Sequence, residues 1–90
     1  MSTVKANVTI VNKLGLHARP AMEFVDCASR FTSEVFVKRG DQSVNGKSIM
    51  EMMLLAATAG TVLEVEATGD DAQAAIDELV KLVASGFDEE

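Results

Sequence analysis

Several residue types are scarce in this sequence, and each absence excludes a class of protein. The 90 residues include no tryptophan and no tyrosine, and they hold one cysteine, one histidine and one proline. Cys27 cannot form a disulfide within the chain, and beside Ala28 on a predicted helix it is expected to be a small core or boundary residue. One histidine and one cysteine are too few to build a metal site alone, so we expect no metal and no cofactor.

Long apolar stretches are also missing. No apolar run reaches the roughly 18 residues that a membrane-spanning helix needs, and no signal-peptide pattern opens the chain. We therefore expect a cytoplasmic protein that does not insert into a membrane. Ninety residues suffice for one core, and no linker, repeat or low-complexity tract divides them, so residues 1–90 are predicted to form a single domain.

The charge is acidic overall but unevenly distributed. The net charge is −6, which argues against a general nucleic-acid binder. Residues 1–50 carry seven Lys or Arg and four Asp or Glu, a balance of +3, whereas residues 51–90 carry one and ten, a balance of −9. The basic excess therefore accompanies His17, the single histidine.

Hydrophobic periodicity predicts seven elements in the order βαββαβα. The predicted strands are 3–11, 33–39, 42–46 and 61–68, and the predicted helices are 18–29, 48–56 and 71–85. In the last strand, Leu63, Val65 and Ala67 alternate with glutamates, which indicates a sheet with one wet face and antiparallel pairing. The fold class is therefore α+β, with the helices stacked on the other face.

The second strand leaves its register open. Val35 and Val37 are expected to point inward, which leaves Phe36 on the outer face, and the reverse register is the alternative. The segment Arg39-Gly40-Asp41 predicts a short hairpin turn to the third strand.

The last helix carries signals at both ends. Asp70 is the expected N-cap, with Gln73 three residues on, which is close to a capping box. Gly86 is expected to end the helix in a left-handed conformation, with Phe87 folding back on the final turn. Residues 88–90 are expected to be a frayed acidic tail.

His17 lies where a strand has ended and a helix is beginning. Pro20 suits the first turn of that helix, because an N–H group there has no intrahelical partner to lose. The N–H groups at a helix start, together with the macrodipole, form a site for an anion such as phosphate. Arg19 adds a guanidinium that can fork onto the same anion. A histidine at this position can also simply cap the helix, and that alternative stays open.

Ser48 has the local pattern of a second helix start. With Glu51 it forms a capping box, in which the Ser48 hydroxyl accepts from the Glu51 N–H and the Glu51 carboxylate accepts from the Ser48 N–H.

The helix after Ser48 is apolar nearly all round. Met52 and Leu55 are expected to face the sheet, while Ile49, Met50 and Met53 point outward as a soft surface for partner proteins. Irregular core filling is the alternative.

Two segments resemble motifs of a known family. Gly15-Leu16-His17-Ala18-Arg19-Pro20-Ala21 resembles the active-site signature of HPr, the histidine phosphocarriers of the phosphoenolpyruvate-dependent sugar phosphotransferase system. Gly46-Lys47-Ser48-Ile49-Met50 resembles the regulatory serine segment of that family, and the similarity covers nearly the whole chain. It implies an open-faced β-sandwich, a four-stranded antiparallel sheet with three helices on one face.

The resemblance also implies a function. Neutral His17 would attack the phosphohistidine of enzyme I through Nδ1 and pass the phosphoryl group to enzyme IIA domains, as a co-substrate rather than an independent enzyme. We expect the backbone N–H groups of Ala18 and Arg19, with the Arg19 side chain, to hold the phosphoryl oxygens. A basic rim around His17 would suit acidic docking surfaces on these partners.

Regulation is implied as well. Ser48 would be phosphorylated by an HPr kinase/phosphorylase, and a dianion there would disrupt docking on the neighbouring apolar surface. The expected partner-binding residues are Lys47, Ile49, Met50 and Met53, and the expected oligomeric state is a monomer.

The sequence leaves two other functions open. One is a regulatory binding module without sugar transport, because the ending Ser85–Glu89 looks somewhat like the nitrogen-branch carriers. The other is a small enzyme that uses His17 as an acid or base. It lacks a second catalytic candidate, since Glu23 is expected to be turned away from His17 by the helix.

Overall fold

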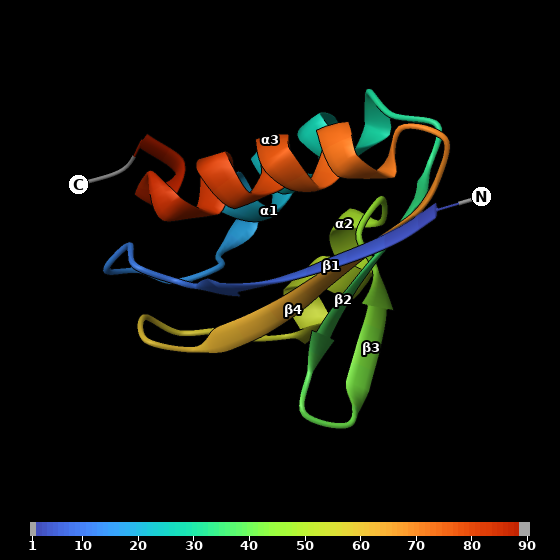
Figure 1. Cartoon of the computed structure of the whole chain (residues 1–90). Coiled ribbons are helices and arrows are strands. Elements are labelled where there is room, and N and C mark those ends of the chain that lie inside the picture. Colours follow the sequence, from blue (N-terminus) through green and yellow to red (C-terminus); the bar gives the residue numbers. More distant parts are fainter. Residues whose placement is uncertain (1, 89–90) are drawn as a thin grey trace.

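The computed structural model describes residues 2–88 and confirms the predicted order of strands and helices. The strands are β1 (Ser2–Thr9), β2 (Glu34–Arg39), β3 (Gln42–Asn45) and β4 (Val62–Gly69), and the helices are α1 (Ala18–Ser29), α2 (Ile49–Leu54) and α3 (Ala72–Ala84). A short 3-10 helix, η1 (Gly86–Asp88), follows α3. Figure 1 shows α1 and α3 lying across one face of the sheet.

The sheet is antiparallel throughout, with the strand order β1-β4-β2-β3. The inward residues Val35 and Val37 are buried, and Phe36 is 37% exposed on the outer face. The register expected for β2 is therefore confirmed and the reverse register is wrong. Phe36 pairs with Glu66 of β4 on this face, and the Glu66 carboxylate lies 2.8 Å from the Lys38 ammonium. The outer face is thus a charged, solvated surface.

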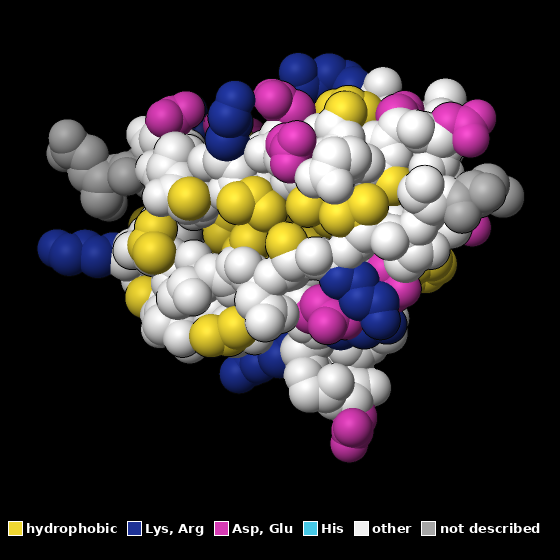
Figure 2. Space-filling model, viewed as in Figure 1, with side chains coloured by type: hydrophobic (Ala, Val, Ile, Leu, Met, Phe, Trp, Pro, Cys, Tyr) yellow, Lys and Arg dark blue, Asp and Glu magenta, His cyan; other side chains and the backbone are white. Residues whose placement is uncertain are grey.

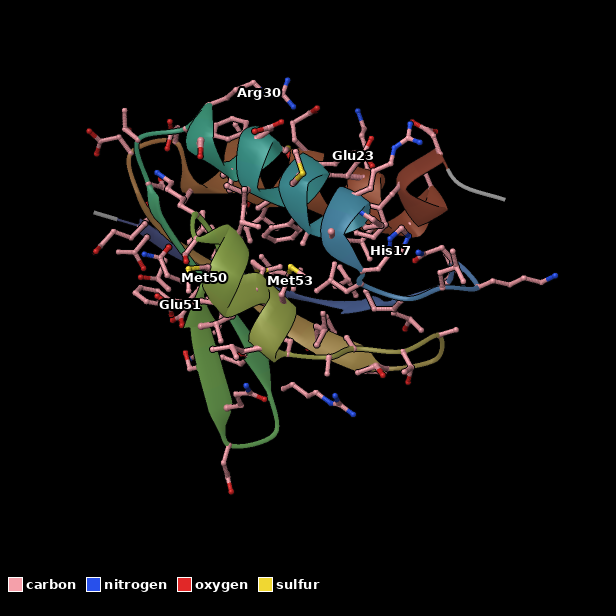
Figure 3. All side chains as sticks on the ribbon, turned by 180° about the vertical axis from the view of Figure 1, so that it is seen from behind. His17, Glu23, Arg30, Met50, Glu51 and Met53 are labelled. Carbon is pink, nitrogen blue, oxygen red and sulfur yellow. The ribbon has the colours of Figure 1, made fainter. Side chains whose placement is uncertain are left out.

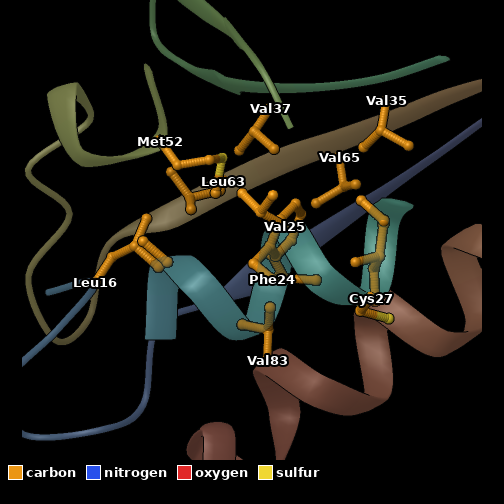
Figure 4. Close-up of a cluster of buried hydrophobic side chains, with 14 of the residues drawn as sticks. Leu16, Phe24, Val25, Cys27, Val35, Val37, Met52, Leu63, Val65 and Val83 are labelled. Atoms are coloured by element: carbon orange, nitrogen blue, oxygen red, sulfur yellow. The ribbon is translucent and has the colours of Figure 1, made fainter. Parts of the chain in front are cut away.

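One hydrophobic core lies between the sheet and the helices, and all three helices contribute to it (Figure 4). Val35, Val37, Leu63 and Val65 rise from the sheet to meet Phe24 and Val25 of α1, Met52 of α2 and Val83 of α3. Cys27 is buried with them, as expected, and burial raises the pKa of its thiol. Each large side chain in such a core contributes about 1.5–3 kcal/mol to the stability of the fold.

The predicted ends of the elements differ from the observed ends by up to two residues. The first strand was expected to run to residue 11, but β1 ends at Thr9. Ile10 still exchanges backbone hydrogen bonds with Gly60 and Thr61, and the chain then turns at Asn12. The expected hairpin is confirmed, because Arg39 pairs with Gln42 across a two-residue turn.

The N-terminus of α3 corrects one prediction. Asp71, rather than Asp70, is the N-cap, and it makes no side-chain cap hydrogen bond, so the expected capping box is wrong. The Asp71 carboxylate instead accepts hydrogen bonds from the backbone and hydroxyl groups of Thr32 and Ser33. These hydrogen bonds, led by the one from the Ser33 hydroxyl, lower the pKa of Asp71 from 3.8 to about 2. The carboxylate therefore ties the start of α3 to the segment between α1 and β2.

The C-terminus of α3 is confirmed in its main features. Gly86 follows the C-cap Ser85 with φ +68°, and Phe87 folds back into the core. Asp88 belongs to η1 rather than to a frayed tail, and residues 89–90 of that expected tail lie outside the described residues. Within residues 2–88, no helix is long and apolar enough to cross a membrane.

The two broad sides of the molecule differ in character. Figure 2 shows hydrophobic side chains gathered in a band between α3 and β1, where a groove is lined by Val4, Ala6, Ile76 and Val80 together with polar and charged residues of both elements. No histidine is visible among the described residues on this side, whereas Figure 3 shows His17 on the opposite side together with α2.

Candidate active site

His17 is placed by the junction between a loop and α1. It is half-buried and occupies the N-cap position, with extended backbone dihedrals of φ −82° and ψ −171°. Its imidazole makes no cap hydrogen bond within the described helix, so the alternative that the side chain simply caps α1 is wrong. Leu16, the preceding residue, is buried and joins the core shown in Figure 4. The backbone on that side of His17 is therefore anchored.

The first turn of α1 presents hydrogen-bond donors directly after His17. The first intrahelical hydrogen bond runs from the Ala21 N–H to the His17 carbonyl over 3.0 Å. The N–H groups of Ala18 and Arg19 precede it and point out of the helix end, where the macrodipole favours an anion. Pro20 contributes no donor and is buried. Arg19 is exposed, so the turn combines two backbone donors with one guanidinium.

The loop before His17 is held by a close backbone contact. Gly15 has φ +69°, and a Cβ atom there would lie 2.5 Å from the Ala57 carbonyl oxygen. The Leu16 N–H donates to that same oxygen over 2.8 Å. Only glycine fits at position 15, because both the positive φ angle and the close contact with the Ala57 carbonyl oxygen exclude a side chain. The residues that follow β1 and α2 are thereby joined behind His17.

Ser48 caps α2 as expected, but only half of the predicted capping box forms. Its Oγ accepts from the Glu51 N–H over 3.2 Å. The Glu51 carboxylate accepts from the Asn45 N–H at 3.0 Å instead of from Ser48, so that part of the prediction is wrong. The reason is that the Ser48 N–H already donates to the Asn45 carbonyl over 3.1 Å, which closes the turn into α2.

The orientation of α2 is confirmed. Met52 and Leu55 are buried, and Ile49, Met50 and Met53 are exposed, Met50 by 81%. Figure 3 shows Met53 between His17 and Met50 in the view onto this side.

Sequence reasoning missed Leu54, which is 67% exposed. Met50, Met53 and Leu54 have i, i+3, i+4 spacing and form one outward row, which we call the α2 stripe. The signal was present, since that spacing is visible in the sequence.

Lys47 lies differently from the other expected partner-binding residues. Its ammonium donates to the Phe31 carbonyl oxygen over 2.7 Å and is half-buried. The lysine therefore links the loop before α2 to the segment after α1, and its charge is partly withdrawn from the surface.

The structure also bears on an acid–base role for His17. Glu23 lies further along α1 and lines a groove between α1 and α3 together with Asp26 and Arg30. Figure 3 shows it separated from His17 along the helix. Glu23, the carboxylate considered for such a role, therefore lies away from His17.

The fold is an open-faced β-sandwich that presents its single histidine at a helix N-terminus, and the comparisons with known proteins identify the class of domain. The chain matches the family model described as the "PTS HPr component phosphorylation site" over residues 4–85. It belongs to this family, the HPr phosphocarriers of the phosphotransferase system.

Relatives share both sequence and fold over nearly the full length. Phosphocarrier protein HPr of Neisseria meningitidis serogroup A is 49% identical over 86 residues, which are 96% of this chain and 97% of that protein. The same protein of Pseudomonas putida is 49% identical over 83 residues, 91% of this chain and 92% of that protein. The crystal structure of HPr-C-His from Thermoanaerobacter tengcongensis has a TM-score of 0.93 at 46% identity and covers 97% of this chain and 98% of its own.

Proposed function

We propose that this chain accepts a phosphoryl group on His17 from phosphorylated enzyme I and passes it to enzyme IIA domains. One observation carries the proposal: His17 directly precedes the outward N–H groups of Ala18 and Arg19 at the start of α1. With the exposed Arg19 guanidinium, these groups supply donors for phosphoryl oxygens. The chain is then a co-substrate of both partner enzymes.

The transfer balances without a net change in protons. A ring nitrogen of neutral His17, for which the family signature implies Nδ1, attacks phosphorus and forms a new N–P bond. The N–P bond to the histidine of enzyme I breaks, and its electron pair returns to that imidazole. The donors of Ala18 and Arg19 stabilise the charge on the transferring oxygens. Transfer to enzyme IIA repeats these events with the roles exchanged.

Intact mass spectrometry tests the carrier role. After incubation with phosphoenolpyruvate and enzyme I, the wild-type chain should gain one phosphoryl group that mild acid removes. His17→Ala should fold normally, because the His17 side chain is only half-buried and makes no cap hydrogen bond to α1. This variant should never gain the phosphoryl group. An unmodified wild-type chain beside an enzyme I that phosphorylates a reference carrier would contradict the proposal and favour the regulatory module.

Ser48 is proposed as a regulatory phosphorylation site that acts through the α2 stripe. A phosphoserine adds about −1.5 to −2 charges, and the N-terminus of a helix favours a negative charge. The fold should therefore tolerate the modification. A partner that buries the α2 stripe would have to desolvate that charge, so association should weaken.

The kinase assay tests this second role. With ATP and an HPr kinase/phosphorylase, the wild-type chain should gain an acid-stable group that Ser48→Ala does not gain. Ser48→Ala should lose about 1 kcal/mol of stability through the missing cap and keep its phosphoryl transfer. Ser48→Asp should raise the KM of enzyme I for the chain, and an unchanged KM would contradict regulation through docking.

A further inference from the structure

Asn12 is a polar side chain buried behind the active site. It is only 3% exposed, and Ser33 is the one other polar residue buried to this degree among residues 2–88. A buried amide is costly unless it is hydrogen-bonded. The Asn12 Nδ2 group donates to the Gly15 carbonyl oxygen over 2.7 Å. Burying an apolar side chain at this position would cost less free energy than burying an amide, which suggests that the amide has a specific role.

The Gly15 carbonyl oxygen connects Asn12 to His17. It accepts the Asn12 Nδ2 hydrogen bond and also accepts from the His17 backbone N–H over 3.0 Å. The Gly15 N–H in turn donates to the Asn12 carbonyl over 3.1 Å, which closes the turn. One oxygen atom therefore separates the buried amide from the backbone of the phosphoacceptor.

The other side of this turn is also fixed. Gly15 lies against the Ala57 carbonyl, and the Leu16 N–H donates to that carbonyl. The Asn12 amide adds a side-chain hydrogen bond to a turn that backbone contacts also hold. Without this N–H donor the Gly15 carbonyl oxygen keeps the His17 N–H, and its orientation is less tightly constrained.

We propose that Asn12 is a positioning residue for His17: its side-chain amide orients the Gly15 carbonyl and, through it, the His17 backbone at the N-cap of α1. This inference rests on the proposed phosphoryl transfer. The His17 backbone dihedrals set the direction of its Cα–Cβ bond and thereby the positions that the imidazole can reach. Errors of about 1 Å in the placement of a reacting group can cost a hundredfold in rate.

Asn12→Asp tests the inference, because it keeps the size of the side chain and removes the N–H donor. Steady-state phosphorylation by enzyme I should show kcat lowered about tenfold or more with KM within about twofold, since the reacting atom is misplaced and the docking surface is unchanged. Asn12→Ser retains a shorter donor and should recover part of kcat. Asn7→Asp on the exposed face of β1 adds the same charge and should match the wild type.

Three outcomes overturn the inference or separate it from the proposed function. A folded Asn12→Asp with wild-type kcat and reduced thermal stability would show a structural role only. A change in KM alone would show a docking role instead. A wild-type chain that enzyme I does not phosphorylate would refute the proposed function, not the hydrogen bond.

A measurement on the wild-type chain keeps the inference testable if the variants do not fold. A scalar coupling across the hydrogen bond from Asn12 Nδ2 to the Gly15 carbonyl carbon should be detectable by NMR. Its absence in the folded wild-type protein would overturn the positioning role.

Discussion

Arg19 is the one charged side chain in the first turn of α1, two residues after His17. Arg19→Ala should slow phosphoryl transfer from enzyme I by roughly ten- to a hundredfold, because a hydrogen bond to a charged group is worth about 1.5–3 kcal/mol. Rapid-quench kinetics measures this rate. Arg30→Ala at the C-cap of the same helix is the matched control and should leave the rate unchanged. Equal losses in both variants would point to general electrostatics rather than to contact with the phosphoryl group.

Alanine substitutions at Gly15 and Gly40 distinguish the cost of backbone strain from the cost of a steric collision. Both have a positive φ, but a Cβ at Gly40 meets nothing within 4 Å, whereas a Cβ at Gly15 meets the Ala57 carbonyl oxygen. Gly40→Ala should therefore cost about 1 kcal/mol, the cost of the left-handed conformation alone. Gly15→Ala should cost clearly more, and urea unfolding at neutral pH measures both. Equal costs would show that the loop moves away from Ala57 easily.

At the scale of a single element, the Asp71 carboxylate at the N-terminus of α3 makes the stability of the fold depend on pH. The pKa of Asp71 is about 2 in the folded chain and 3.8 ordinarily. Its hydrogen bonds to Thr32 and Ser33 therefore stabilise the fold fully above about pH 4, and this stabilisation is lost as the pH falls through 2. Asp71→Asn should lower the thermal midpoint at pH 7, and the difference from the wild type should narrow between pH 4 and pH 2.

The neighbouring Asp70 provides the control for that experiment. It is exposed and lies at the same end of α3, so Asp70→Asn removes a charge of the same sign from the same place. Its effect on the thermal midpoint should be smaller at pH 7. Parallel curves for the Asp71 variant and the wild type down to pH 2 would contradict the role of the Asp71 carboxylate.

The α2 stripe should act as a docking surface for enzyme I. Met50→Gln and Leu54→Gln should each raise the KM of enzyme I for the chain about fivefold, the effect of losing about 1 kcal/mol of apolar burial. The value of kcat should not change, because neither side chain belongs to the first turn of α1. Val62→Gln replaces an exposed apolar residue on β4 and should leave KM unchanged. A KM unaffected by both stripe variants would exclude this surface.

The elements were predictable because burial follows the local period of the sequence. Alternation favoured Phe36 outside the core but left the reverse register open, and the burial of Val35 and Val37 decided between the two. Hydrogen bonds at helix ends were less predictable, since they depend on residues that the fold brings together. Glu51 bonds to Asn45 rather than to the serine of its own box, and Asp71 reaches Ser33, which lies 38 residues away.

In the candidate site too, the local sequence predicted the position of a residue but not its contacts with distant parts of the chain. The single proline and the change of period located His17 at the start of a helix. The contact between Gly15 and Ala57 and the buried amide of Asn12 were not predicted, because both depend on the packing of the loop against residues that follow α2. The sequence shows which groups do chemistry more readily than it shows what orients them.

At the scale of the whole molecule, folding divides the basic half of the sequence. Lys5 and Lys38 lie on the outer face of the sheet in ion pairs with Glu66. Arg39 donates to the backbone carbonyl of Leu55 at the end of α2, and Lys47 donates to that of Phe31 in the segment after α1. The basic rim expected around His17 therefore contains fewer positive charges than the balance of +3 in residues 1–50 suggests. Next to His17 in the chain it consists of Lys13 and Arg19, both of which are exposed.

Lys13 should therefore contribute to long-range attraction without taking part in the chemistry. If the docking surface of enzyme I is acidic, as the family implies, Lys13→Gln should raise KM about two- to threefold at low ionic strength and leave kcat unchanged. The difference should vanish near 1 M salt, where the Debye length is about 3 Å. Lys5→Gln alters the net charge equally on the outer face of β1 and should have no effect on KM at any salt concentration. If both variants raise KM to the same extent, attraction follows the net charge of −6 and not the placement of individual cations.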